Sequence, residues 1–157
     1  MTALTQSILS LNRKKLPVIK QEQLSECGHA CVAMIGNYHG HTIDLFSLRA
    51  IEPPSMNGSS MLDLVHILEK LDFTTRAIRV DIDELKYVQS PAILHWNMNH
   101  FVVLKSVYSK YIVVHDPAVG ERRVSFNELS NSFTGIVLEV EKNEDFSAIH
   151  ARRRLTL

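Results

Sequence analysis

Hydrophobic residues in the first half of the chain follow helical spacing. An unbroken apolar run over 30–35, closed by Gly36, predicts a buried helix that begins near Gly28. A second, shorter amphipathic stretch over 43–51 predicts another helix, which the proline pair at 53–54 ends. The N-terminal half is therefore expected to be helical.

A third helix is predicted over 61–71 by its start signal. Ser60 precedes it and Asp63 follows three residues later, which is the spacing of a capping box. Apolar residues then recur with a helical period and predict the face that packs on the core. That predicted stripe consists of Leu62, Val65, Ile67, Leu68 and Leu71.

The second half of the chain is rich in short apolar and β-branched runs bounded by turn residues, which predicts strands. Because helices come first and a mostly antiparallel sheet follows, we expect an α+β fold. The expected strands lie at 74–80, 91–96, 101–107, 111–115, 122–125 and 135–141, with a helical turn at 81–88 and a short helix at 127–133.

Length and charge point to one domain with local recognition. The 157 residues are 45% hydrophobic, enough for a sizeable core. Seventeen basic residues balance seventeen acidic ones, so no overall field favours nucleic acid, and no nucleic-acid partner is expected. No run is long and apolar enough for a membrane span. Residues 1–17 lack signal-peptide patterning and predict a loosely docked arm, or alternatively a membrane-surface helix.

Cys27 stands where the first helix is about to begin. Unpaired backbone N–H groups and the helix dipole favour a thiolate at such a position. Cys31 lies four residues later in the apolar run and is expected in the core, so a bridge between the two would distort the helix. Unbridged thiols fit a reducing compartment.

A histidine and a carboxylate frame the hairpin predicted over 100–117. His100 opens its first strand and Asp116 closes its second, so the two can be neighbours in space. A cysteine, a distant histidine and a carboxylate that holds the imidazole are the parts of a thiol peptidase. Gln21, six residues before Cys27, can donate a hydrogen bond to an oxyanion beside the sulfur.

The stretches QEQLSECGHAC, PAILHWNMNHFVVL and YIVVHDPAVG together resemble the papain-like cysteine peptidase domain of bacteriocin and microcin ABC exporters, the colicin V secretion type especially. The resemblance covers about 18–140. It implies Cys27 as nucleophile, His100 as general base, Asp116 as the residue that orients it, and Gln21 as oxyanion-hole donor. None of these four positions departs from the family pattern.

That resemblance also carries a function. Such domains remove leader peptides after a double glycine, and the rest of the leader binds as an amphipathic helix in an apolar groove. The resemblance implies a papain-like fold, no cofactor for cleavage, and a place at the cytoplasmic face of the inner membrane beside the transmembrane and ATP-binding domains of the same exporter. It divides the chain into an arm (1–17), a peptidase domain (18–141) and a tail leading toward a transmembrane domain (142–157).

Two other functional classes stay open. The same family contains relatives without the cysteine that only bind leaders, so a catalytically silent binding module is the first alternative. A zinc-binding domain is the second, because four N and S donors suffice for a tetrahedral site, although their spacing within an apolar run disfavours it. The four donors are Cys27, Cys31, His39 and His41.

Three residues of the hairpin region have open roles. His95 competes with His100 for the role of base, being five residues away and also near a strand end. Trp96 either contributes to substrate binding in the cleft or packs in the core. His115 is expected to point to the other face of its strand from Asp116 and to be structural.

The tail combines a solvated segment with a basic cluster. Residues 146–157 are expected to form a solvent-exposed tail, which includes three arginines at 152–154. A basic cluster just before a membrane helix is typical of the cytosolic side. The chain is therefore expected to be one domain of a larger exporter.

Overall fold

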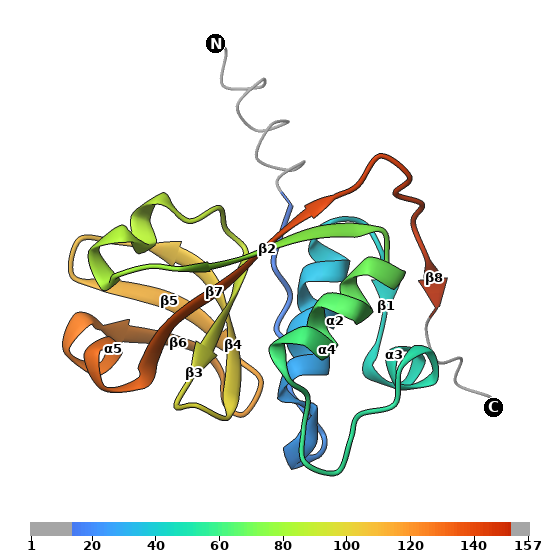
Figure 1. Cartoon of the computed structure of the whole chain (residues 1–157), viewed down its shortest axis with the longest axis horizontal. Coiled ribbons are helices and arrows are strands. Elements are labelled where there is room, and N and C mark those ends of the chain that lie inside the picture. The colour runs from blue at the N-terminus through green and yellow to red at the C-terminus, as the bar shows by residue number, and fades with distance from the viewer. Residues whose placement is uncertain (1–13, 152–157) are drawn as a thin grey trace, which may run out of the picture.

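The computed structural model describes residues 14–151 (Figure 1). Helices gather in one half of the molecule and a six-stranded sheet forms most of the other, while β2 and β7 run from one half to the other. This is the α+β arrangement expected from the sequence. No helix of the described part is long and apolar enough to cross a membrane.

The helical half begins with a short 3₁₀ turn that leads directly into the helix of Cys27. Asp44 caps the next helix by accepting from the Ser47 N–H at 2.8 Å, and Ser60 and Asp63 form the predicted capping box. The elements are η1 (Leu24–Glu26), α2 (Cys27–Tyr38), β1 (Thr42–Ile43), α3 (Leu45–Ile51) and α4 (Met61–Lys70).

Two details of the helical half differ from the sequence prediction. The helix α2 continues through Gly36. The side-chain amide of Asn37, a residue type that often ends helices, donates to the carbonyls of Ala33 and Ile43 at 2.7 and 2.6 Å, so its hydrogen-bonding capacity is used without ending the helix. The predicted core stripe of α4 was wrong at one position: Leu62 is 61% exposed, and Leu64 is fully buried.

The sheet is antiparallel throughout, in the order β2-β7-β3-β4-β5-β6. Every strand predicted from the sequence is present, with ends that shift by one or two residues. The elements are β2 (Phe73–Arg79), η2 (Ile82–Tyr87), β3 (Ala92–Trp96), β4 (His100–Val107), β5 (Tyr111–Asp116), β6 (Gly120–Ser125), α5 (Phe126–Ser132) and β7 (Phe133–Lys142).

Apolar side chains of the two sheet faces belong to two separate cores. Phe101 and Val103 of β4 pack with α2 and α4, whereas Val102 and Leu104 join a second cluster with η2 and α5. This alternation is the period of two that a strand buried on both faces imposes. It holds α2 firmly against the middle of the sheet, where β4 lies.

The C-terminal segment docks onto the helical half. The short strand β8 (His150–Ala151) pairs in parallel with β1, and the Ile149 N–H donates to His41 Nδ1 at 2.9 Å. Phe146 and Ile149 pack against the larger core. The expectation of a solvated tail was therefore wrong at Phe146 and Ile149, which are partly buried, whereas the residues at 147, 148 and 150 are exposed. The arginines at 152–154 and residues 1–13 of the arm lie outside the described residues.

Candidate active site

Cys27 is the first residue of α2, as its position in the sequence predicts. It is 6% exposed and lies at the positive end of the helix dipole. Gly28 lets α4 approach this end closely, because a Cβ there would lie 2.7 Å from Leu64 Cδ2. The apolar run that buries α2 thus holds the thiol in place.

A buried ion pair fixes the turn that precedes the thiol. Glu26 is fully buried, accepts from the Gln23 N–H at 2.8 Å and pairs with Arg49 of α3. Burial raises the pKa of the Glu26 carboxyl, but Arg49 and the backbone donors outweigh it and hold that pKa below its usual value. Arg49 also reaches Glu22 at 2.8 Å, so α3 ties down the chain on both sides of η1.

His100 and Asp116 meet across the β4–β5 hairpin, which confirms the predicted neighbours. His100 Nε2 lies 2.7 Å from Asp116 Oδ1, and the same oxygen accepts from the Ala118 N–H at 2.9 Å. A carboxylate only accepts, so Nε2 carries the proton and Nδ1 is left to face the thiol. Asp116 is 6% exposed, which keeps this hydrogen bond out of water.

The titration of Cys27 and His100 is linked by their contact. Burial raises the pKa of the Cys27 thiol, yet the hydrogen bond to His100, a backbone donor and the attraction of the imidazolium lower it overall. Burial lowers the pKa of His100, but Asp116 and Cys27 outweigh it and raise that pKa to about 9. The pair therefore favours thiolate and imidazolium near neutral pH.

Gln21 is anchored beside this pair through its backbone. Its N–H donates to the Pro117 carbonyl at 2.9 Å, one residue after Asp116. Among the described residues its buried side-chain oxygen has no hydrogen-bond partner. That oxygen only accepts hydrogen bonds, and an oxyanion donor must be the amide nitrogen, so the role of Gln21 in the oxyanion hole stays a prediction.

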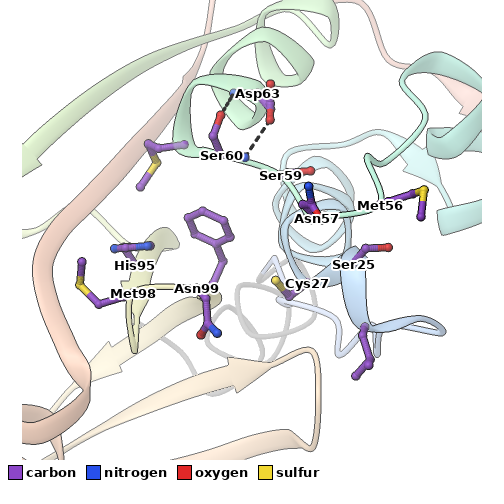
Figure 2. Close-up of a pocket in the computed structure, with 14 residues that line it drawn as sticks. Ser25, Cys27, Met56, Asn57, Ser59, Ser60, Asp63, His95, Met98 and Asn99 are labelled. Carbon is purple, nitrogen blue, oxygen red and sulfur yellow. Dashed lines mark hydrogen bonds between the residues drawn. The ribbon is translucent and has the colours of Figure 1, made fainter.

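A cleft of about 650 Å³ opens in front of Cys27 (Figure 2). Cys27 and Ser25 lie on its helical wall; His95 comes from β3, and Met98 and Asn99 from the turn between β3 and β4. The loop before α4 forms part of the remaining wall. Its residues at the cleft are Met56, Asn57, Gly58, Ser59 and Ser60, with Met61 and Asp63 in the first turn of the helix.

The turn that leads into His100 has an unusual backbone. Asn97 and Met98 both have positive φ, at 49° and 65°, and the Asn97 N–H donates to the Ser132 carbonyl at 2.7 Å. Met98 is neither glycine nor asparagine, so this conformation costs about 1 kcal/mol. The turn sets where β4 begins and leaves Met98 77% exposed at the rim of the cleft.

The other candidates near the hairpin occupy separate positions. His95 lines the cleft but bonds Thr134 Oγ1 at 2.9 Å rather than a carboxylate, so the triad geometry belongs to His100. Trp96 is 3% exposed in the second core and is not among the residues lining the cleft; its proposed substrate contact stays a prediction. His115 faces the Pro17 carbonyl and Glu121, the structural role predicted for it.

Two of the four candidate zinc ligands, Cys31 and His41, are held inside the fold by contacts of their own. Cys31 is fully buried in the apolar core, which raises the pKa of its thiol well above the usual value. His41 bonds the Leu71 carbonyl with one ring nitrogen and the Ile149 N–H with the other. Within residues 14–151, the side chains whose possible ligand atoms lie close enough together to hold a metal ion are an exposed trio: Asp81, Asp83 and Glu84.

The sheet-borne imidazole and carboxylate, the thiol at a helix N-terminus and the cleft that opens beside this thiol define a papain-like cysteine peptidase. A family model described as the Peptidase C39 family matches residues 15–145. The chain belongs to the peptidase C39 family.

Two of the relatives that the chain resembles are secretion/processing ATP-binding proteins. The chain is 41% identical over 145 residues to the colicin V secretion/processing ATP-binding protein CvaB of Escherichia coli, and 43% identical over 145 residues to the probable microcin-H47 secretion/processing ATP-binding protein MchF of the same species. Each alignment covers 92% of this chain. The chain spans about a fifth (21%) of the length of these two relatives.

Solved structures share the fold. A double glycine motif protease from an AMS/PCAT transporter, solved in complex with the leader peptide, is 36% identical with a TM-score of 0.78, over 83% of this chain and 94% of that one. The peptidase domain of Streptococcus ComA has a TM-score of 0.76 at 22% identity, over 82% of this chain and all of that one. The papain-like expectation is confirmed.

Sequence reasoning missed most of the cleft wall and a charged residue behind the triad. The loop over 56–60 carries turn residues and no periodicity, so nothing in the sequence placed it opposite His95. Arg122 lies 3.7 Å from Asp116 Oδ2 and 2.5 Å from Glu128. The signal available was its position two residues after the turn glycine Gly120, which aligns it diagonally with Asp116.

Proposed function

We propose that this domain cleaves double-glycine leader peptides from bacteriocin or microcin precursors, with Cys27 as nucleophile. The observation that carries the proposal is the Cys27–His100–Asp116 arrangement at a cleft, in a chain 36% identical to a double glycine motif protease. The cleaved bond follows the second glycine. A leader-binding module without catalysis is less well supported because all three groups are present and in contact.

The chemistry assigns one step to each group. The Cys27 thiolate attacks the carbonyl carbon of the last leader residue, and the C–N bond then breaks as the His100 imidazolium protonates the departing amine. Water, deprotonated by His100, attacks the thioester and releases the leader acid and the free thiol. Gln21 and the backbone N–H of Cys27 stabilise the oxyanion in both steps, and Asp116 keeps His100 oriented and charged.

Glycines before the cleaved bond suit the position of the thiol. Cys27 is only 6% exposed at the base of the cleft, so an approaching backbone must come close to the helix end. A side chain on the residue before the cut would occupy that approach. The remainder of the leader is proposed to bind outside the site as an amphipathic helix, so that recognition and chemistry use separate surfaces.

The partners follow from the proposal that this domain is part of a larger protein. The relatives are ATP-binding secretion proteins about five times as long as the matched segment. We propose that transmembrane and ATP-binding domains of an exporter adjoin this one, which would then work at the cytoplasmic face of the inner membrane. Cleavage itself is proposed to need no cofactor, since thiol, imidazole and carboxylate supply nucleophile, acid and base.

The test uses the purified chain and a synthetic precursor with a Gly-Gly site. Wild type is expected to release leader and core after the second glycine, and Cys27→Ala to release nothing while binding leader and precursor with similar affinity in a calorimetric titration. A precursor with valine as the last leader residue should bind and resist cleavage.

A matched control is Cys31→Ala, which removes the other thiol and should retain cleavage. Processing by Cys27→Ala would overturn the nucleophile. Leader binding by wild type without any cleavage would establish the binding-only alternative, and loss of leader binding by folded Cys27→Ala would contradict separate recognition.

A further inference from the structure

Arg122 places a positive charge behind the catalytic carboxylate. On β6 it pairs with Val114, and Asp116 pairs with Gly120, so Arg122 lies diagonally beside Asp116 on the same face of the sheet. Its Nη1 is 3.7 Å from Asp116 Oδ2. That distance is too long for a hydrogen bond, so the contact acts through charge.

The two oxygens of Asp116 face different partners. Oδ1 accepts from His100 and from the Ala118 N–H at 2.7 and 2.9 Å, while Oδ2 faces Arg122. Asp116 is 6% exposed, so little water competes at either oxygen. Arg122 is therefore the charged group that balances the carboxylate on the side away from the imidazole.

Glu128 holds Arg122 in place. Its Oε1 lies 2.5 Å from Arg122 Nη2, and it belongs to α5, which packs behind β6. The Glu128 backbone N–H is fixed in turn by the Ser125 hydroxyl at 3.2 Å. One terminal nitrogen of the Arg122 guanidinium is thus anchored on α5, while the other faces Asp116.

We propose that Arg122, anchored by Glu128, is a positioning residue of the active site, whose charge orients the Asp116 carboxylate and sets the pH range in which the thiolate–imidazolium pair exists. The proposal rests on the peptidase assignment of the site. It does not depend on which peptide is cleaved.

The sign of the effect follows from the charges that surround the pair. A positive charge behind Asp116 disfavours the His100 cation and favours the Cys27 anion, so its removal should raise the pKa of both groups. Loss of the Glu128 negative charge should lower both. Besides Cys27 and His100 themselves, titratable and charged groups from several elements surround the thiolate–imidazolium pair. They are Cys31 from α2, Asp116 from β5, Arg122 from β6, Glu128 from α5, and Lys20, which lies beside Gly120.

The experiment measures the pH dependence of Cys27 alkylation by iodoacetamide in the full chain, with Cys27 followed by peptide mass spectrometry. Arg122→Gln should raise the midpoint by about 0.5–1 pH unit, and Arg122→Lys should restore it to within about 0.3 unit. Glu128→Gln should move it down. Arg123→Gln is the matched control, because Arg123 lies on the other face against Tyr111 and should leave the midpoint unchanged.

A purely structural role of the Arg122–Glu128 ion pair predicts a different result. Such a role would make Arg122→Gln and Glu128→Gln lower the melting temperature equally and leave the alkylation midpoint of Cys27 unchanged. That result would overturn the proposal, and so would an equal shift of the midpoint in Arg123→Gln. If Arg122→Gln does not fold, Glu128→Gln decides: a downward shift supports the proposal, and no shift or an upward one contradicts it. Alkylation needs no substrate, so failure of double-glycine cleavage is a separate result.

Discussion

The imidazole of His100 and the carboxylate of Asp116 meet at 2.7 Å from opposite ends of one hairpin, at the point where β4 begins and β5 ends. Because Asp116 accepts from Nε2, the other ring nitrogen is directed to the Cys27 thiol. One short contact thereby selects the tautomer of the base and supports its charge.

Replacing Asp116 separates orientation from charge. Asp116→Asn keeps an acceptor for Nε2, as the Asn of a Cys-His-Asn site does, and should lower kcat/KM less than Asp116→Ala, which should cost about a hundredfold or more. The alkaline limb of the pH profile, expected about pH 9 in wild type, should move down in Asp116→Asn because the imidazolium loses its anion. Glu121→Gln removes a carboxylate from the neighbouring strand β6 and is the control. An unmoved alkaline limb in Asp116→Asn would refute this role.

The two thiols should differ in reactivity. Cys27 lines the cleft with a lowered pKa, and Cys31 is fully buried with a pKa well above its usual value. Iodoacetamide at neutral pH is therefore expected to modify Cys27 at least about tenfold faster in the native protein. Site-resolved mass spectrometry measures both rates, and the difference should disappear in denaturant. Equal native rates would contradict the assignment.

Gln21 should contribute to turnover and little to substrate binding. Gln21→Ala removes one donor from the oxyanion and is expected to lower kcat about a hundred- to a thousandfold, with KM nearly unchanged. Gln23→Ala, two residues away and exposed, is the matched control. Steady-state kinetics on the Gly-Gly precursor measure both constants. A kcat of Gln21→Ala within twofold of wild type would show that this amide serves packing alone.

His39 should weaken the fold in mild acid. Burial, with Lys14, Lys142 and His41 nearby, lowers its pKa from 6.5 to about 4, and its Nε2 has no hydrogen-bond partner among the described residues. Between pH 6.5 and about 4 the unfolded chain binds more protons, so stability falls as pH falls.

Replacing His39 with an uncharged ring tests this linkage. The difference in free energy of unfolding between His39→Phe and wild type should shift in favour of the variant by about 1 kcal/mol from pH 7 to pH 5, after allowance for solvent screening. The free energy of unfolding at the two pH values is the measurement, and His66→Gln on the exposed face of α4 is the control. A His39→Phe difference that does not change between the two pH values would rule the linkage out.

Local patterns predicted the elements, whereas the family resemblance predicted the triad. The apolar run after Gly28, the Ser60–Asp63 capping box and the short β-branched runs are local signals, so α2, α4 and the strands follow from residues close in sequence. Cys27 at a helix start and His100 and Asp116 at strand ends follow from the same signals. The face of α4 was misassigned at Leu62, since which side is buried depends on what packs there.

Tertiary structure decided the register that makes the site. Near the turn Val107 pairs with Ile112 and Ser106 with Val113, but beyond a bulge at Lys105 the pairing shifts to Leu104 with Val114 and Val103 with His115. Without that shift Asp116 would fall opposite Val103 and point away from the face of His100; with it, Asp116 falls opposite Val102, two residues from His100 and on the same face.

Contacts between distant segments were likewise beyond sequence reasoning. The loop over 56–60 meets His95 across the cleft, and Arg122 reaches both Asp116 and Glu128 only because β6 and α5 fold back on β5. The tail docks because Phe146 and Ile149 pack against the larger core, a contact between distant segments that the local pattern does not reveal. The sequence by itself determined which groups are candidates for the chemistry. The packing of distant strands and helices determined what surrounds those groups, because burial and charge at a site are sums over residues far apart in the chain.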